Sequence, residues 1–194
     1  MKYKNTLQKG SVRFIIFKED AAWYGVCLEF NIVEEGSTPQ EAYMLLNEAA
    51  QGYVESARKI KARPHILNQV SDCEYESLWS KLQGAEDQKE KMPSVFSFGK
   101  INLNQLRNNA SAPAWLFMSK GVFNWTAEEV VRFLKDRGFS LNHSRGSHLY
   151  YVGHANGSFR QVSVPFHGAR AIKPRTMKGI ILQSGIEKSE WLRK

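Results

Sequence analysis

The alternation of apolar and polar residues near the start of the chain predicts three strands followed by a helix. β-Branched and aromatic residues at 12–17 and 23–30 indicate a hairpin, and a short apolar run after it indicates a third strand. Thr38 and Pro39 then supply a helix cap and a first helical residue, with Glu41 completing a capping box. Apolar residues with the spacing of one helical face follow at Ala42, Leu45, Leu46, Ala49 and Tyr53. The N-terminal unit is therefore predicted to be β-β-β-α.

The middle of the chain has a weaker pattern. A capping box at 71–74 and the apolar residues after it predict a short helix ending at Gly84, and the apolar run 95–98 predicts a further strand. Residues 102–113 are rich in Asn, Ala and Ser, a composition typical of an inter-domain linker. The predicted domains are residues 1–110 and 118–194.

The last part of the chain has the clearest pattern. A capping box at 126–129 starts an amphipathic helix that ends before Gly138, and Pro174 opens a second helix that ends at Gly185. Between them, three strands are predicted at 139–143, 147–153 and 159–165. The order α-β-β-β-α is that of a double-stranded-RNA-binding-like domain, in which helices cover one sheet face and leave the other open. The predicted fold class is α+β.

The charge is unevenly distributed along the chain. Residues 1–117 carry 14 basic and 14 acidic residues, whereas residues 118–194 carry 13 and 5, which accounts for the whole net charge of +8. The segment 19–57 holds eight acidic residues and no Lys or Arg. Two interpretations remain: two independently solvated surfaces, or a basic domain that binds a polyanion beside an acidic domain that competes for the same surface.

The composition excludes several classes of protein. With 42% hydrophobic residues and no apolar run of roughly 18 to 20 residues, the sequence predicts no membrane span, and its start has no signal-like apolar core. We therefore expect a cytoplasmic protein. Cys27 and Cys73 are far apart and lack Cys or His partners at metal-binding spacing, so we expect no disulfide, metal or cofactor.

Four segments of the C-terminal domain carry a family resemblance. Gly-Phe at 138–139, Arg-Gly-Ser-His at 145–148, the Val-Pro-Phe-His-Gly region within 162–168 and the helix 176–182 are similar in order and spacing to the HicA toxin family. The resemblance covers roughly residues 119–192. It implies an mRNA interferase, a small endoribonuclease that needs no metal. One departure is Arg175-Thr176, where the family usually has Gly-Thr.

A second resemblance covers the N-terminal unit. The β-β-β-α pattern with the segments 35–42 and 45–49 resembles the HicB antitoxin family over about residues 10–60, which implies a partial RNase H-like fold. Together the two resemblances imply a toxin–antitoxin fusion that forms homo-oligomers. The DNA-binding appendage of many HicB proteins is not evident in residues 62–117, so binding to operator DNA is not expected.

His148 is the candidate catalytic residue. Strand alternation places it on the open sheet face with Tyr150, while Leu149 and Tyr151 pack beneath the helices. Cleavage of RNA without a metal needs a base that removes the 2′-hydroxyl proton, and a histidine with a pKa of about 6.5 suits this task. The resemblance assigns the same role to His148. The structural alternative is a surface histidine bonded to a backbone carbonyl.

The other candidate residues are predicted to contact RNA or to form the inhibitory interface of the N-terminal domain. The predicted RNA contacts are Arg145, Ser147, Lys173, Arg175 and Lys178. We expect His167 to shape the loop before the last helix, with RNA contact as the alternative, and His143 and His154 to be turn or strand-end residues. The predicted inhibitory interface is Trp23, Tyr24, Phe30, Glu34 and Glu35.

The sequence thus predicts a C-terminal endoribonuclease that an N-terminal antitoxin-like domain holds inactive by covering the face of His148. A short tether would make this inhibition intramolecular, at an effective concentration on the order of millimolar. Two alternatives from other classes remain. The C-terminal domain could bind RNA without cleaving it, or the chain could be a purely regulatory protein–protein module.

Overall fold

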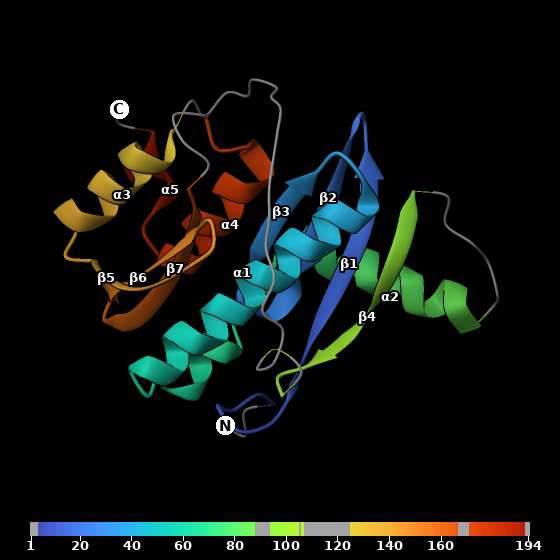
Figure 1. The fold of residues 1–194 in the computed structure, drawn as a ribbon, viewed down its shortest axis with the longest axis horizontal. Helices are drawn as coiled ribbons and strands as arrows, with labels where there is room; N and C mark the ends of the chain where they lie inside the picture. Colours follow the sequence, from blue (N-terminus) through green and yellow to red (C-terminus); the bar gives the residue numbers. More distant parts are fainter. Residues whose placement is uncertain (1–3, 88–93, 105, 107–124, 167–170, 193–194) are drawn as a thin grey trace.

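The computed structural model describes residues 4–87, 94–104, 106, 125–166 and 171–192. Two antiparallel sheets, each with its own helices, lie side by side (Figure 1). This arrangement confirms the predicted α+β class. No described helix combines the length and the apolar character needed to cross a membrane.

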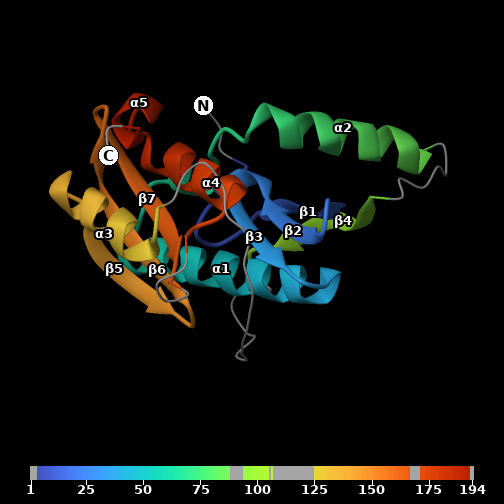
Figure 2. The ribbon, with the colours of Figure 1, turned by 90° about the horizontal axis from the view of Figure 1, so that it is seen from above.

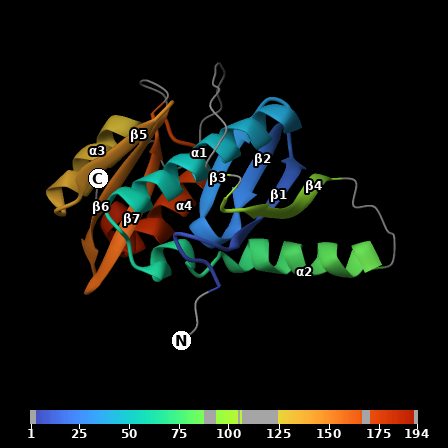
Figure 3. The ribbon, with the colours of Figure 1, turned by 60° about the horizontal axis from the view of Figure 1, so that its bottom comes forward.

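The N-terminal unit is a four-stranded sheet between two helices. Its elements are β1 (Ser11–Glu19), β2 (Ala22–Cys27), the 3-10 helix η1 (Leu28–Phe30), β3 (Ile32–Gly36), α1 (Pro39–Lys59), the 3-10 helix η2 (Pro64–Leu67), α2 (Cys73–Asp87) and β4 (Val95–Asn102). The strand order is β3-β2-β1-β4, and α1 and α2 lie on opposite faces of the sheet (Figures 2 and 3). Each helix buries its own apolar cluster against the sheet. The sequence pattern predicted three of these strands in a row, and β4 forms where a further strand was predicted.

The C-terminal unit has the predicted α-β-β-β-α order with one short helix added. Its elements are α3 (Ala127–Asp136), β5 (Ser140–Arg145), β6 (His148–Ala155), β7 (Ser158–Pro165), α4 (Pro174–Ser184) and α5 (Lys188–Trp191). Thr126 and Glu129 form the complete capping box of α3, and Gly185 ends α4 with a φ of +65°. The strand order is β5-β6-β7, and α3, α4 and α5 share one apolar core with the same sheet face.

Three local predictions are wrong. Residues 28–30 form a 3-10 helix rather than extended strand, because the chain reverses at Asn31, whose φ is +52°. Helix α2 continues past Gly84 to Asp87, since a single glycine weakens a helix without ending it. Asp72 rather than Ser71 caps this helix, because the Asp72 carboxylate accepts the Glu74 N–H at 3.0 Å.

Helix α1 connects the two units. It is 21 residues long, or about 30 Å at 1.5 Å per residue. Its first half covers the N-terminal sheet, and its second half lies against β5, β6 and β7 on the face opposite α3 and α4 (Figure 2). The sheet face that the sequence predicts to be open in the C-terminal domain is therefore covered by α1 in the full chain.

Candidate functional site

His148 lies beneath α1, at one end of the central strand of the sheet. A tight turn at Gly146, with a φ of +50°, joins β5 to β6, and His148 is the first residue of β6. It pairs with Arg145 on one side and Pro165 on the other. We call this side of the sheet, with His143, Arg145, His148 and Tyr150, the covered face.

Two carboxylates of the N-terminal unit enclose the imidazole. His148 Nε2 lies 3.0 Å from Glu34 Oε1 of β3, and Nδ1 lies 3.2 Å from Glu48 Oε1 of α1. The His148 side chain has no exposed surface. Burial opposes the charged form, but the two carboxylates outweigh it and raise the pKa of His148 to about 9. The hydrogen bond from His148 lowers the pKa of Glu48 to about 2. The imidazole is therefore protonated near neutral pH.

The neighbouring cation on β5 is bound in the same way. Arg145 donates from Nη1 to Glu55 Oε1 and from Nη2 to Gln51 Oε1, each at 2.6 Å. The Ser147 N–H donates to Glu48 Oε1 at 3.0 Å. Both residues were predicted to contact RNA, and in the full chain both contact acceptors on α1 instead.

The Tyr150 side chain packs directly against the backbone of α1. The Tyr150 hydroxyl donates to the Ala49 carbonyl at 3.0 Å, and a Cβ at Gly52 would overlap the Tyr150 ring. Gln161 of β7 donates to the Tyr53 carbonyl at 2.8 Å. These buried contacts leave no room for a nucleic acid between helix and sheet.

A second contact surrounds the first turn of α4, which we call the α4 entry (Lys173, Arg175 and Lys178). Arg175 binds Glu19 through two nitrogens and donates to Glu74 Oε1 at 2.9 Å. Its guanidinium also lies 5.4–5.9 Å from three aromatic ring centroids, those of Phe17, Tyr24 and Tyr75. Lys173 Nζ lies 3.1 Å from Glu35 Oε1, and Lys178 Nζ lies 2.8 Å from Asp72 Oδ2. Each predicted phosphate contact in this turn is paired with a carboxylate of the N-terminal unit.

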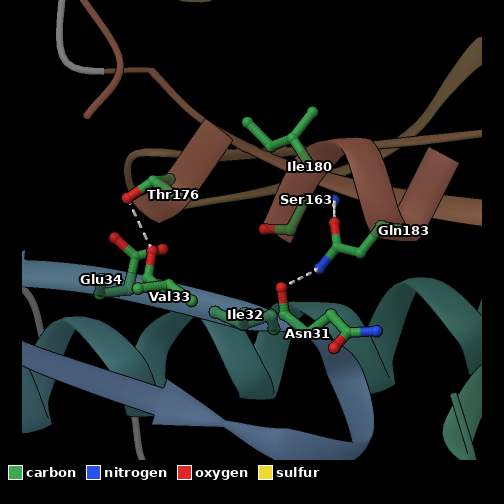
Figure 4. Close-up of a pocket in the computed structure, with 8 residues that line it drawn as sticks. All are labelled: Asn31, Ile32, Val33, Glu34, Ser163, Thr176, Ile180 and Gln183. Atoms are coloured by element: carbon green, nitrogen blue, oxygen red, sulfur yellow. Dashed lines mark hydrogen bonds between the residues drawn. The ribbon is translucent and has the colours of Figure 1, made fainter. Parts of the chain in front are cut away.

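A shallow pocket between β3 and α4 shows how the strand meets the helix (Figure 4). Thr176 Oγ1 donates to the Val33 carbonyl at 2.9 Å. Gln183 accepts from the Ser163 N–H at 2.8 Å and donates to the Asn31 carbonyl at 3.3 Å. Side chains of α4 thus form hydrogen bonds with backbone groups of both units at this edge.

The predicted interface residues have different positions in the structure. Glu34 contacts His148, Glu35 contacts Lys173, and Tyr24 lies against Arg175. Trp23 was expected at the interface but packs against Phe96 of β4, with ring centroids 6.0 Å apart. The strand alternation explains this, because adjacent residues of β2 point to opposite faces.

Phe30 was also predicted to belong to the inhibitory interface. It is fully buried in the N-terminal core, where it stacks on Tyr53, and its carbonyl accepts a hydrogen bond from Gln183 of the C-terminal unit. His167 lies outside the described residues.

Sequence reasoning missed the face of α1 that contacts the covered face. Glu48, Gln51, Gly52 and Glu55 are spaced 0, 3, 4 and 7, so they share one face of the helix. This face could have been found beside the apolar stripe that predicted the helix. Asp72 and Glu74 were also missed, because nothing in the local sequence links the start of α2 to α4.

The described residues contain no group of three or more His, Cys, Asp or Glu side chains arranged to hold a metal ion. The site consists instead of imidazole, guanidinium and ammonium groups opposite carboxylates. Once uncovered, such cations could bind phosphates, and a neutral His148 could accept a proton.

Comparison with known proteins finds a similarity for part of the chain. The model of the family described as HicA toxin of bacterial toxin-antitoxin matches residues 127–186, from the first residue of α3 to just beyond α4. No match was found among curated proteins or among solved structures. The predicted HicA resemblance of the C-terminal unit is confirmed, and the matched segment contains His148 and the whole α4 entry.

Proposed function

We propose that the C-terminal unit is an mRNA interferase, a metal-independent endoribonuclease with His148 as its general base. We further propose that the N-terminal unit is a HicB-like antitoxin that keeps this enzyme inactive within one chain. The observation that carries the proposal is the enclosure of His148, in a segment that matches a toxin family, between Glu34 and Glu48.

The mechanism assigns separate tasks to the residues of the covered face and the α4 entry. A neutral His148 would remove the proton of a ribose 2′-hydroxyl, and the resulting oxygen would attack the adjacent phosphorus. Arg145 and Lys173 would stabilise the charge of the phosphorane. Arg175 and Lys178, near the first turn of α4, would bind flanking phosphates.

The covered state opposes each of these tasks. A protonated His148 with both nitrogens bound to carboxylates cannot accept another proton. Arg145 and Lys173 are bound to Glu55 and Glu35. Because RNA phosphates and carboxylates need the same cations, the N-terminal unit and RNA would compete for one surface.

The proposal also assigns a fold to each domain. The α-β-β-β-α order supports a double-stranded-RNA-binding-like C-terminal domain over 118–194, and the β-β-β-α start supports a partial RNase H-like N-terminal domain over 1–110. RNA is the proposed substrate. A homo-oligomer and a cytoplasmic location remain predictions.

The test compares the native chain with a variant changed at the contact with the covered face and with a matched control changed elsewhere. A released variant combines Glu48→Lys, which reverses a charge beside His148, with Gly52→Leu, which places a side chain where the Tyr150 ring lies. A matched control combines Gln40→Lys, an exposed position near the start of α1, with Gly84→Leu, where a Cβ meets nothing within 4 Å. Circular dichroism verifies that both chains are folded.

Labelled RNA provides the readout. We expect the released variant to cleave RNA at least about 100-fold faster than the native chain and the matched control, and to lose this activity with His148→Gln. RNA binding by the released variant without cleavage would favour the non-catalytic alternative. A folded native chain as active as the released variant would contradict the inhibitory role of the N-terminal unit.

A further inference from the structure

The covered face carries a second histidine that the mechanism above does not use. His143 lies on β5 opposite Tyr150, and Arg145, two residues later, lies opposite His148. Residues that pair directly across antiparallel strands share a sheet face. His143 and His148 are therefore diagonal neighbours on one face, a relation that separates their positions by about 7–8 Å.

A β-bulge is what places His143 on this face. Leu141 pairs with Tyr151, and the next pair is His143 with Tyr150, so Asn142 is the extra residue of the bulge. In an unbroken register His143 would pair with Leu149, which packs with the core beneath α3 and α4. The bulge therefore turns both His143 and Arg145 toward His148, as bulges beside active sites commonly redirect a side chain.

Like His148, His143 contacts a carboxylate of α1, although its side chain remains 27% exposed. His143 Nε2 lies 3.1 Å from Glu55 Oε2 of α1, and its ring stacks on Tyr150 with centroids 5.8 Å apart. Glu48 and Glu55 are seven residues apart on α1, which is two helical turns on one face. One face of α1 thus presents a carboxylate to each of the two histidines.

From this geometry we propose that His143 is the general acid of the reaction in which His148 is the general base; the inference rests on the function proposed above. His148 removes the 2′-hydroxyl proton as the 2′-oxygen forms a bond to phosphorus. The bond from phosphorus to the 5′-oxygen breaks, and that oxygen takes a proton from the His143 imidazolium. The products are a 2′,3′-cyclic phosphate and a 5′-hydroxyl, and the histidines then exchange protons with water.

The other groups near His143 do not fit the role of the acid. Among the described residues, Glu55 of α1, Arg145 of β5 and Tyr150 of β6 lie next to it, and Lys59 of α1 donates to the carbonyl of the adjacent Asn142. Glu55 and Lys59 belong to the N-terminal unit, which has to leave this face before RNA binds. Arg145 does not release its proton in proteins, and Tyr150 donates its hydroxyl proton to the Ala49 carbonyl. His154 is six residues from His148 along β6, about 20 Å away.

The experiment uses the released variant and two substrates that differ in one atom. The first substrate is an RNA oligonucleotide cut at a mapped bond. The second has sulfur in place of the bridging 5′-oxygen of that bond. A thiolate leaves without help from an acid. Cleavage of the sulfur substrate should therefore depend on the general base but not on the general acid.

We expect His143→Gln in the released variant to slow cleavage of the RNA by about 100-fold or more and that of the sulfur substrate by less than about tenfold. His148→Gln should slow both substrates by about 100-fold or more, and the control His154→Gln, at an exposed position, should change neither. Loss of the basic limb of the pH–rate profile should accompany His143→Gln.

Equal slowing of both substrates by His143→Gln, or no slowing of either, would overturn the role of His143 while leaving the proposed ribonuclease intact. If the folded released variant with both histidines cleaves neither substrate, the proposed function fails, and the role of His143 fails with it.

Discussion

The ion pairs of His148 at the covered face and of Arg175 at the α4 entry differ in how far water is excluded from their carboxylates: the side chains of Glu34 and Glu48 are 5% and 17% exposed. At the covered face, His148 and Tyr150 have no exposed surface, and Gly52 of α1 lies directly against the Tyr150 ring. At the α4 entry, the carboxylates of Glu19 and Glu74 that hold Arg175 remain 45% and 47% exposed.

This difference predicts that the two contacts affect different quantities, the stability of the contact and the rate of association. Exposed ion pairs typically contribute about 0–1 kcal/mol each and weaken in salt, whereas removing one partner of a buried charge costs about 3–5 kcal/mol. The covered face should therefore hold the two units together. The α4 entry should mainly guide their association, since exposed charges act most strongly on the association rate.

The largest effect is expected at the covered face. Glu34→Ala leaves the buried His148 with one carboxylate instead of two, and we expect the free energy of unfolding to fall by about 3 kcal/mol or more. Urea denaturation followed by circular dichroism measures this loss. A loss no larger than that of Glu74→Ala, the matched removal of a carboxylate at the α4 entry, would remove the distinction between the regions.

The pH dependence should also be dominated by the covered face. Since the two carboxylates raise the pKa of His148 to about 9 from an ordinary value of about 6.5, its contribution is complete below about pH 6.5 and is lost as the pH rises through 9. The loss should be on the order of 3 kcal/mol. The lowered pKa of Glu48 acts on the acid side, where its contribution disappears as the pH falls from about 4.5 toward 2.

Urea denaturation at pH 6 and pH 9.5 measures the alkaline loss, with His148→Gln as the control. The variant should be equally stable at the two pH values apart from groups that titrate in both chains. An alkaline loss of the same size in His148→Gln would show that other groups cause it.

Trp23 provides a comparison outside both regions. Trp23→Ala removes the contact with Phe96 on β4, and we expect the stability of the N-terminal unit to fall by about 2 kcal/mol. Because the contacts of Trp23 in the described part of the chain are with Phe96, Lys18 and the N-terminal core, RNA cleavage by the folded variant should stay at the native level. An increase in cleavage without unfolding would make Trp23 part of the inhibitory contact after all.

The smallest effect is expected at the α4 entry. Arg175→Lys keeps the charge but loses the two-nitrogen contact with Glu19 and the stacking over Tyr24. We expect a loss of about 1 kcal/mol at low ionic strength that shrinks at about 0.5 M salt. A loss that does not change with salt would mean that this region, too, is held by buried contacts.

The sequence was sufficient to predict those elements that are determined by neighbouring residues. The capping box at Thr126, the turn that uses Asn156 and Gly157, and the end of α4 at Gly185 are set by neighbouring residues, and all three were predictable. The face of His148 also followed from alternation along β6 alone.

The missed features depend on distant parts of the chain. The alternation of β5 does not reveal the bulge at Asn142, so His143 could not be placed on the covered face from sequence. The partners of Arg175 come from β1 and α2, about 100 to 156 residues away. Only the tertiary arrangement identifies these contacts.

The most direct test of the account is the titration of His148 by nuclear magnetic resonance in the full chain. The resonance is assigned from its absence in His148→Gln. If the N-terminal unit keeps His148 protonated, the pKa of His148 is about 9 in the native chain and returns toward about 6.5 in the released variant. A His148 pKa near 6.5 in both chains would contradict the account, because the histidine would then be neutral and available in the presence of its proposed inhibitor.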